Sequence, residues 1–181
     1  MGLEMNANRI ANANGSFEPQ RTNNAILTID QIQDSDILQL ALNTFPIPKQ
    51  SNEIVEIGYM NETRKVAGKA IYEDLTVLYQ DYVDKQIASI LWNWRYQVYN
   101  PITGKIGLAK DYKKSGKVKL VDPSGDNPRD YKIVGMWISN MNPGEIDHTA
   151  SDTVKIECTI TIDKAYPLFD SNIIEKGIKT L

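Results

Sequence analysis

The sequence predicts a mainly β protein of the α+β class: an antiparallel β-sandwich or barrel of about seven strands, with one flanking helix and an extended hairpin arm. Short apolar runs, several of them alternating and separated by turn-forming residues, are typical of antiparallel sheets. Only one long segment repeats its apolar residues at helical spacing. The polar stretch 61–69 lies between two strand-like runs and has too few apolar residues to pack onto a core of its own, which predicts the arm.

Four strands are expected before residue 80, at 25–32, 36–42, 53–60 and 70–79. The first two are separated by three polar residues and are expected to pair as a hairpin. Pro46 and Pro48 cannot donate ladder hydrogen bonds, so the sheet should break there. Residues 1–23 are rich in Asn and small side chains, and on their own they are expected to be disordered.

Residues 81–98 are expected to form the only long helix. Its main apolar face consists of residues spaced three and four apart: Val83, Ile87, Ile90, Leu91, Trp94 and Val98. Asp81 is the expected N-cap, and Pro101 and Gly104 should end the helix. Ala88, Trp92 and Tyr96 form a second stripe, so the helix is expected to be buried on more than one side, and a partner subunit is one candidate for the second cover.

The C-terminal half predicts three more strands, beginning with the end of the lysine-rich segment 105–120. The turn-rich segment 122–130 precedes a strand at 131–137, and 138–152 is expected to be a loop. Residues 153–163 alternate without interruption, with Ile156, Cys158 and Ile160 on the apolar face. The expected domain boundaries are an N-terminal extension at 1–23, the β domain at 24–166 and a C-terminal extension at 167–181, where Ser171 could cap a short amphipathic turn.

Composition excludes several classes of protein. The 181 residues fit one soluble domain, with 41% apolar and 24% charged residues, and the net charge of −3 argues against a dedicated nucleic-acid binder. The sequence contains neither an apolar run long enough for a membrane helix nor a secretory signal, so no membrane anchor is expected. The single cysteine excludes an internal disulfide.

The sequence offers little support for catalysis. His148 is the only histidine, so a Ser-His-Asp triad or a two-histidine metal site is excluded, and a surface position is expected. Cys158 is expected to be buried and inert. Neither a phosphate-binding loop nor a calcium loop matches its required spacing. We therefore expect no enzyme activity, no catalytic or metal-binding residues and no cofactor.

Several stretches resemble the tail tube protein of contractile-tailed bacteriophages, whose relatives include the inner tubes of phage-like injection machines and the Hcp tube of type VI secretion. The similar stretches are Ile57-Gly58-Tyr59-Met60-Asn61, Lys65-Val66-Ala67-Gly68, Tyr72-Glu73-Asp74-Leu75-Thr76-Val77, Asp111-Tyr112-Lys113-Lys114-Ser115 with Val118, and Ile133-Val134-Gly135-Met136-Trp137. The resemblance covers about residues 25–166. Ile138 follows the tryptophan where the family commonly has proline.

The resemblance implies a structural subunit rather than an enzyme. Family members form hexameric rings that stack into a hollow tube, and one sheet of each subunit joins a continuous barrel around the lumen. A contracting sheath surrounds the tube, and the lumen carries the tape measure protein and DNA during ejection. Baseplate or tube-initiator proteins and a tail terminator complete the tail. The expected location is the virion tail, assembled in the cytoplasm of the bacterial host.

The resemblance also assigns expected roles to residues. The arm should contact the adjacent ring or neighbouring subunit through Met60, Asn61, Glu62, Thr63, Arg64, Lys65, Val66, Ala67, Gly68 and Lys69, with Gly68 supplying a turn conformation. Sheath or subunit contacts are expected at Lys105, Lys110, Lys113 and Lys114. The lumen or solvent face of the last strand should present Thr153, Lys155, Glu157, Thr159, Thr161 and Asp163. Because sliding DNA should not be held tightly, the lysines of 105–119 are expected to face away from a neutral or acidic lumen.

Three alternatives remain. The same architecture would serve a capsid-less contractile injection system or an Hcp-like secreted tube. A monomeric ligand-binding β-sandwich would instead place Trp92, Trp137 or Tyr99 in a concave site. A β-barrel enzyme is the weakest alternative, because the sequence contains neither a catalytic motif nor more than one histidine.

Overall fold

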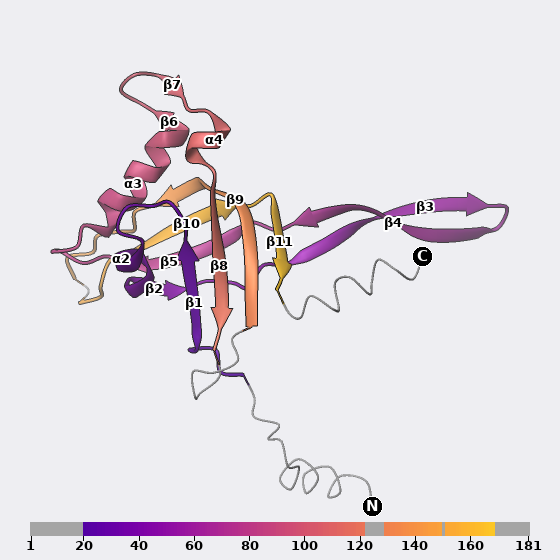
Figure 1. Ribbon diagram of the computed structural model, residues 1–181, viewed down its shortest axis with the longest axis horizontal. Coiled ribbons are helices and arrows are strands. Elements are labelled where there is room, and N and C mark those ends of the chain that lie inside the picture. The colour runs from indigo at the N-terminus through magenta and orange to yellow at the C-terminus, as the bar shows by residue number, and fades with distance from the viewer. Residues whose placement is uncertain (1–19, 122–128, 150, 169–181) are drawn as a thin grey trace, which may run out of the picture.

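The computed structural model describes residues 20–121, 129–149 and 151–168. Seven strands form one antiparallel sheet in the order β1-β8-β9-β10-β5-β2, with β11 pairing with β9 off this path (Figure 1). These strands are β1 (Ala25–Ile29), β2 (Leu42–Thr44), β5 (Leu75–Gln80), β8 (Lys114–Leu120), β9 (Arg129–Asn142), β10 (Lys155–Thr161) and β11 (Lys164–Pro167). The mainly β, antiparallel fold that the sequence predicts is confirmed.

The remaining elements lie outside this sheet. Strands β3 (Gln50–Tyr59) and β4 (Glu62–Tyr72) form a separate hairpin that projects far from the body (Figure 1). Helix α3 (Ile87–Val98) leads into a small hairpin of β6 (Tyr99–Asn100) and β7 (Lys105–Ile106), followed by α4 (Ala109–Tyr112). The short helix α2 (Ser35–Leu40) lies between β1 and β2.

The long strand β9 folds the sheet into two parts. Its first half pairs with β8 on one side and β11 on the other, and its second half pairs with β10. Between the halves the register with β8 shifts, and Gly135 has a φ of +75°. A Cβ atom at Gly135 would collide with the carboxylate of Asp163, so glycine meets both the conformational and the spatial requirement here.

One core fills the space between the two parts of the sheet and α3. Val77, Val118, Ile133, Ile138 and Cys158 are completely buried within it. Helix α3 contributes Ile87, Leu91 and Trp94, and the indole Nε1 of Trp94 donates a hydrogen bond to the Tyr112 carbonyl oxygen at 2.9 Å. The core therefore satisfies the one polar atom that its largest side chain brings in.

The predicted strand at 36–42 is wrong. Residues Ser35–Leu40 form α2, and β1 pairs with β8 instead of a hairpin partner. Leu38 and Ala41 are buried three residues apart, which is helical spacing, so burial on one side of a helix outweighs the strand-like composition of this run. The break at Pro46 and Pro48 is confirmed, because β2 ends at Thr44 and β3 begins at Gln50.

The long helix is confirmed, but its predicted start and its N-cap are wrong. Its first residue is Ile87, after Gln86 in the left-handed region with a φ of +49°. Asp81 instead continues the end of β5, since its backbone N–H donates to the Val154 carbonyl oxygen at 3.1 Å. Val83, which the apolar pattern placed in the core stripe, is 98% exposed.

Two further strand boundaries and one helix differ from the prediction. The run 70–79 is divided at Glu73 and Asp74 into β4 and β5. Strand β9 continues through Ile138 to Asn142, into the predicted loop, because Ile138 is an inward-facing core residue. Helix α4 was not predicted. The turn-rich stretch 122–128, the extension 1–19 and the predicted cap at Ser171 lie outside the described residues.

Candidate functional site

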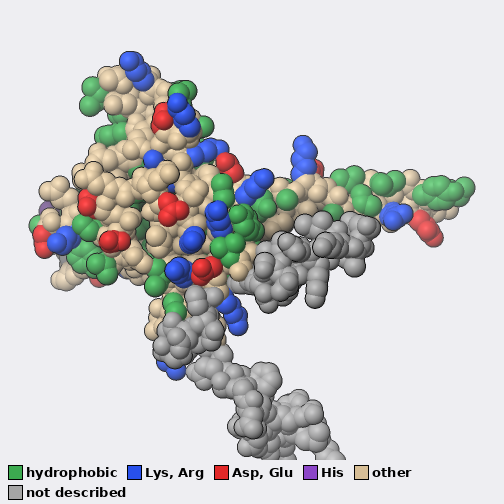
Figure 2. Space-filling view, viewed as in Figure 1, with side chains coloured by type: hydrophobic (Ala, Val, Ile, Leu, Met, Phe, Trp, Pro, Cys, Tyr) green, Lys and Arg blue, Asp and Glu red, His purple; other side chains and the backbone are tan. Residues whose placement is uncertain are grey.

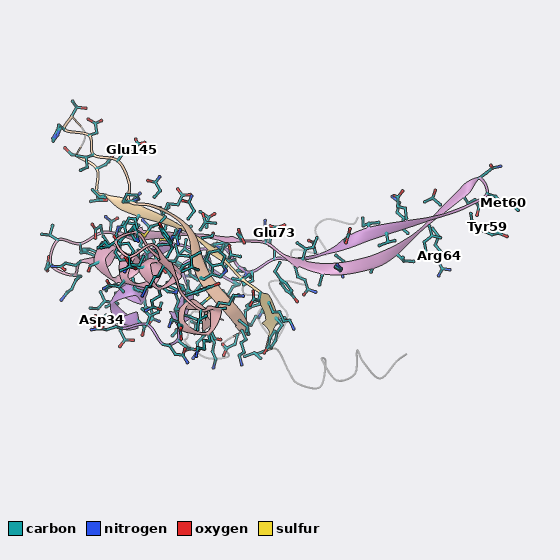
Figure 3. The ribbon with its side chains drawn as sticks, turned by 90° about the horizontal axis from the view of Figure 1, so that it is seen from above. Asp34, Tyr59, Met60, Arg64, Glu73 and Glu145 are labelled. Atoms are coloured by element: carbon teal, nitrogen blue, oxygen red, sulfur yellow. The ribbon has the colours of Figure 1, made fainter. Side chains whose placement is uncertain are left out.

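The arm, defined here as residues 50–72, is the most conspicuous feature of the surface. Every residue of β3 is exposed, and most of β4 is exposed or half-buried. At about 3.3 Å per residue, the ten residues of β3 span about 33 Å. Figure 3 places Tyr59 and Met60 at the tip and Glu73 at the base. The expected extended hairpin is thus present, and it begins eleven residues before the polar stretch 61–69.

One face of the arm is rich in apolar side chains, although Arg64 and Glu62 also lie on it. The strand register places Val55 opposite Val66, Ile57 opposite Arg64 and Tyr59 opposite Glu62, so these side chains share a face. Green apolar side chains follow the arm to its end in Figure 2. On the opposite face Glu56 and Lys65 form an ion pair at 3.2 Å. An apolar face with no cover in its own chain indicates a contact surface.

Gly68 does not form a turn, contrary to the prediction. The hairpin turns at Met60 and Asn61, where Met60 has a φ of +52°. Gly68 lies within β4, beside the irregular pairing near Glu53. A Cβ atom there would lie 3.0 Å from the Glu53 carbonyl oxygen and 3.1 Å from Val55 Cγ2, so close approach of the two strands explains the glycine.

The main sheet has strands with one unpaired edge. Within the described part of the chain, β1 pairs only with β8, β2 only with β5 and β11 only with β9. Unpaired strand edges can accept a strand from another chain. The sheet is therefore open in a single copy, and a second copy could extend it.

The lysines of 105–119 do not act as one cluster. Lys113 Nζ contacts both carboxylate oxygens of Asp163 at 2.7 Å, and Lys114 Nζ donates to the Asp111 carbonyl oxygen at 2.8 Å. Lys105 and Lys110 are exposed around β7 and α4. Of the four expected contact residues, Lys113 and Lys114 are therefore held by bonds within the chain, whereas Lys105 and Lys110 have no ion-pair partner among the described residues.

The other lysines of this segment belong to a basic sheet face. Lys117 and Lys119 alternate with the buried Val118 on β8. Lys117 lies opposite Lys132 of β9, and Lys164 of β11 shares the same face. This surface, here called the basic face, carries Lys117, Lys119, Lys132 and Lys164, with Asp130 of β9 opposite Lys119.

Strand β10, within the run predicted at 153–163, alternates as predicted. Ile156, Cys158 and Ile160 are buried, whereas Lys155 and Glu157 are exposed and Thr159 and Thr161 are half-buried. On the neighbouring β5, Thr159 lies opposite Thr76, Glu157 opposite Leu78 and Lys155 opposite Gln80. This surface, here called the hydroxyl face, carries one positive and one negative charge on β10. Thr153 precedes the strand and donates its hydroxyl to Gln80 Oε1 at 3.2 Å, and Asp163 follows it in the ion pair with Lys113.

An aromatic groove of about 360 Å³ lies between the second half of α3 and β9. It is lined by Trp92, Arg95, Tyr96, Tyr99, Pro101, Asn140 and Met141. The rings of Trp92 and Tyr96 are 5.4 Å apart. Trp92 and Tyr99 thus share a concave site, as the ligand-binding alternative expected, but Trp137 is not part of this lining and packs edge-on against Tyr112 at 5.8 Å.

Catalytic chemistry finds no support in the described residues. They contain no group of three or more potential metal ligands among His, Cys, Asp and Glu. His148 is exposed, as expected, and Cys158 is buried, where desolvation, with a smaller contribution from Glu157, raises the pKa of its thiol to about 12. Burial likewise raises the pKa of Tyr79. In a surface turn, the hydrogen bond that the Thr149 hydroxyl donates to Asp147 lowers the pKa of this exposed carboxyl group. No helix in the described ranges has the length and apolar character needed to cross a membrane.

The sequence matches no protein-family model. A search of curated proteins likewise finds no significant match.

Solved structures show a clear likeness. The chain resembles a component of the PVC sheath-tube complex, an extracellular contractile injection system in its extended state, with a TM-score of 0.63 and 16% identity over 83% of this chain and 92% of that one. It resembles a chain of the tube-terminating cap of the anti-feeding prophage, with a TM-score of 0.67 and 13% identity over 87% and 95% of the two chains. It also resembles the SPP1 tail tube, with a TM-score of 0.55 and 10% identity over 90% and 87%. The chain therefore has the fold of tail tube proteins, and the fold that the resemblance implies is confirmed.

Proposed function

We propose that this chain is a structural subunit of the inner tube of a contractile phage tail, assembling with itself into stacked hexameric rings. The observation that carries the proposal is a tail tube fold that leaves two kinds of surface uncovered in one copy: unpaired sheet edges and a projecting arm with an apolar face. Pairing of sheet edges between copies would close each ring, and the arms would connect one ring to the next.

The lumen wall is proposed to be the hydroxyl face. A channel for DNA should offer few fixed cations, because each lysine would occur six times in a ring and phosphate contacts raise affinity steeply. The hydroxyl face carries one Lys and one Glu on β10, whereas the basic face carries four lysines and one acidic residue, Asp130. The basic face is accordingly assigned to the outside of the channel.

The outer surface is proposed to contact a sheath through Lys105 and Lys110, with Lys113 and Lys114 held close by. A chain of similar fold belongs to a sheath-tube complex, and others belong to a terminating cap and a baseplate assembly, which supports corresponding partners here. Passage of DNA and tape measure protein, location in the virion and assembly in the bacterial cytoplasm follow from the same proposal.

The test is negative-stain electron microscopy of the purified full chain over a range of concentrations. Stacked rings or tubes support the proposed function. Discrete small particles at high concentration would refute it and favour the ligand-binding alternative, for which the aromatic groove is the candidate site. A tube of the same architecture would also serve a capsid-less injection system or Hcp-like secretion, which neighbouring capsid and terminase genes would distinguish.

A further inference from the structure

The arm tip displays a large apolar side chain at an energetic cost. Met60 is 91% exposed and has a φ of +52°, a left-handed conformation that is unfavourable for a non-glycine residue. Hairpin turns with positive φ at this position favour glycine. Beside it Tyr59 is 72% exposed, and Glu62 has no ion-pair partner among the described residues. The monomer gains nothing visible from a methionine here, which indicates that another surface receives it.

The aromatic groove has the matching chemistry. Tyr96 and Tyr99 are 40% and 44% exposed, and Trp92 and Met141 are half-buried beside them. Thioether groups bind favourably against aromatic rings, and a flexible Met side chain adapts to an irregular groove. Arg95 lies half-buried in the lining, and no side-chain hydrogen bond or ion pair satisfies its guanidinium group within the described chain.

The groove cannot receive the tip of its own chain. The arm leaves the body in the direction away from α3, and Figures 1 and 3 both show its tip far from the helix. Any occupant from this sequence must therefore come from a second copy. The charges agree with that occupant, since Glu62 lies beside the tip and Arg95 lines the groove, and neither has an ion-pair partner among the described residues.

We infer that the arm tip of one subunit docks in the aromatic groove of a second copy of this chain, with Met60 against Trp92, Tyr96 and Tyr99 and with Glu62 paired to Arg95. The inference rests on the proposed function and sharpens it, because it names the receptor of the arm. It also gives Trp92 and Tyr96 of the second stripe of α3 a partner.

Cysteine cross-linking tests the contact in assembled protein. The full chain carrying Met60→Cys and Tyr96→Cys is assembled and treated with a short bis-maleimide. Denaturing gels should then show a ladder of cross-linked subunits. The matched control carries Met60→Cys and Val83→Cys, because Val83 is exposed but lies in the segment before α3, whereas Tyr96 lies near the end of that helix. The control should stay monomeric on the gel. Cys158 is buried and does not compete.

A charge exchange tests the ion pair. Glu62→Arg and Arg95→Glu, each alone, should raise the protein concentration needed for sedimentable assembly up to about fivefold, the range for one exposed ion pair. The double variant should return it to within about twofold of wild type. Equal impairment in the double variant would contradict the pairing.

Met60→Gly separates docking from stability. Glycine relieves the turn, so thermal unfolding of the unassembled variant should occur at or above the wild-type temperature. Assembly should nevertheless require about tenfold or more protein, because the anchoring side chain is lost. Normal assembly of Met60→Gly would overturn the inference.

The outcomes separate this inference from the proposed function. Wild-type tubes without the Met60–Tyr96 cross-link and without charge rescue would overturn the docking contact and leave the tube function standing. A wild-type chain that never assembles would overturn both.

Discussion

Excising the arm should leave the body of the protein folded and abolish the stacking of rings. The change removes Glu53–Lys69 and joins Asn52 to Ala70 through Asn-Gly, because Asn52 and Ala70 are directly opposite in the hairpin register. A two-residue Asn-Gly connection suits such a pair. Removing only Glu62–Lys69 would also be expected to stop stacking, but it would leave most of β3 without a partner strand.

The expected cost to the monomer is small. None of the removed residues belongs to the buried core or packs against it. Among the ion pairs of the described residues, the excision removes only Lys65–Glu56, which is exposed at both partners and contributes about 0–1 kcal/mol. For a domain of this size that corresponds to a fall in melting temperature of at most about 2–4 °C. Sedimentation of the variant should show no stacked tubes at concentrations where the wild-type chain pellets.

Circular dichroism with temperature and sedimentation with electron microscopy provide the two measurements. The matched control is Val83→Ser, which also alters an exposed apolar residue but lies outside the arm, and it should assemble normally. An excised variant that polymerises like wild type would refute the role of the arm. One that fails to fold would refute the independence of body and arm.

Three further predictions concern the body. Trp94→Ala should lower the free energy of unfolding by about 3–5 kcal/mol in denaturant titration, because it empties a buried site and removes the hydrogen bond to Tyr112; Trp94→Phe should cost less. Gly135→Ala should destabilise by more than about 1 kcal/mol, since φ is +75° and the new Cβ meets Asp163, and an unchanged melting temperature would contradict the proposed strain. Burial raises the pKa of the Cys158 thiol from 9.0 to about 12, so the thiol contributes stability that is fully present below about pH 9 and is lost as pH rises toward 12. Between pH 9 and 10 this thiol should make the free energy of unfolding fall by at most about 1.4 kcal/mol per pH unit. Cys158→Ala should remove this contribution to the slope. The native thiol should also resist alkylation at pH 8 and react after unfolding.

Local patterns in the sequence were sufficient where burial follows periodicity. The alternation in β10 and the spacing of Ile87, Leu91 and Trp94 correctly predict which side chains are buried. The arm was recognisable because a polar stretch between strand-like runs had no core to join.

Long-range packing decided what the sequence did not show. The run at 36–42 is compatible with a strand or a helix, and its burial against the core selects the helix α2. The aromatic groove is lined by α3 and the turn after it on one side and by β9, far along the sequence, on the other. Only the second apolar stripe of α3, with Trp92 and Tyr96, indicated it in the sequence. The turn at Met60 was assigned to Gly68 instead, because a methionine with positive φ has no sequence signal.

Cryo-electron microscopy of the assembled wild-type chain tests the central claim most directly. We expect a hollow tube of stacked six-membered rings, with each arm lying on another subunit and the hydroxyl face of β10 toward the channel. Particles without rings, or a tube whose arms lie free in solvent and whose Lys117, Lys119 and Lys132 line the channel wall, would contradict it.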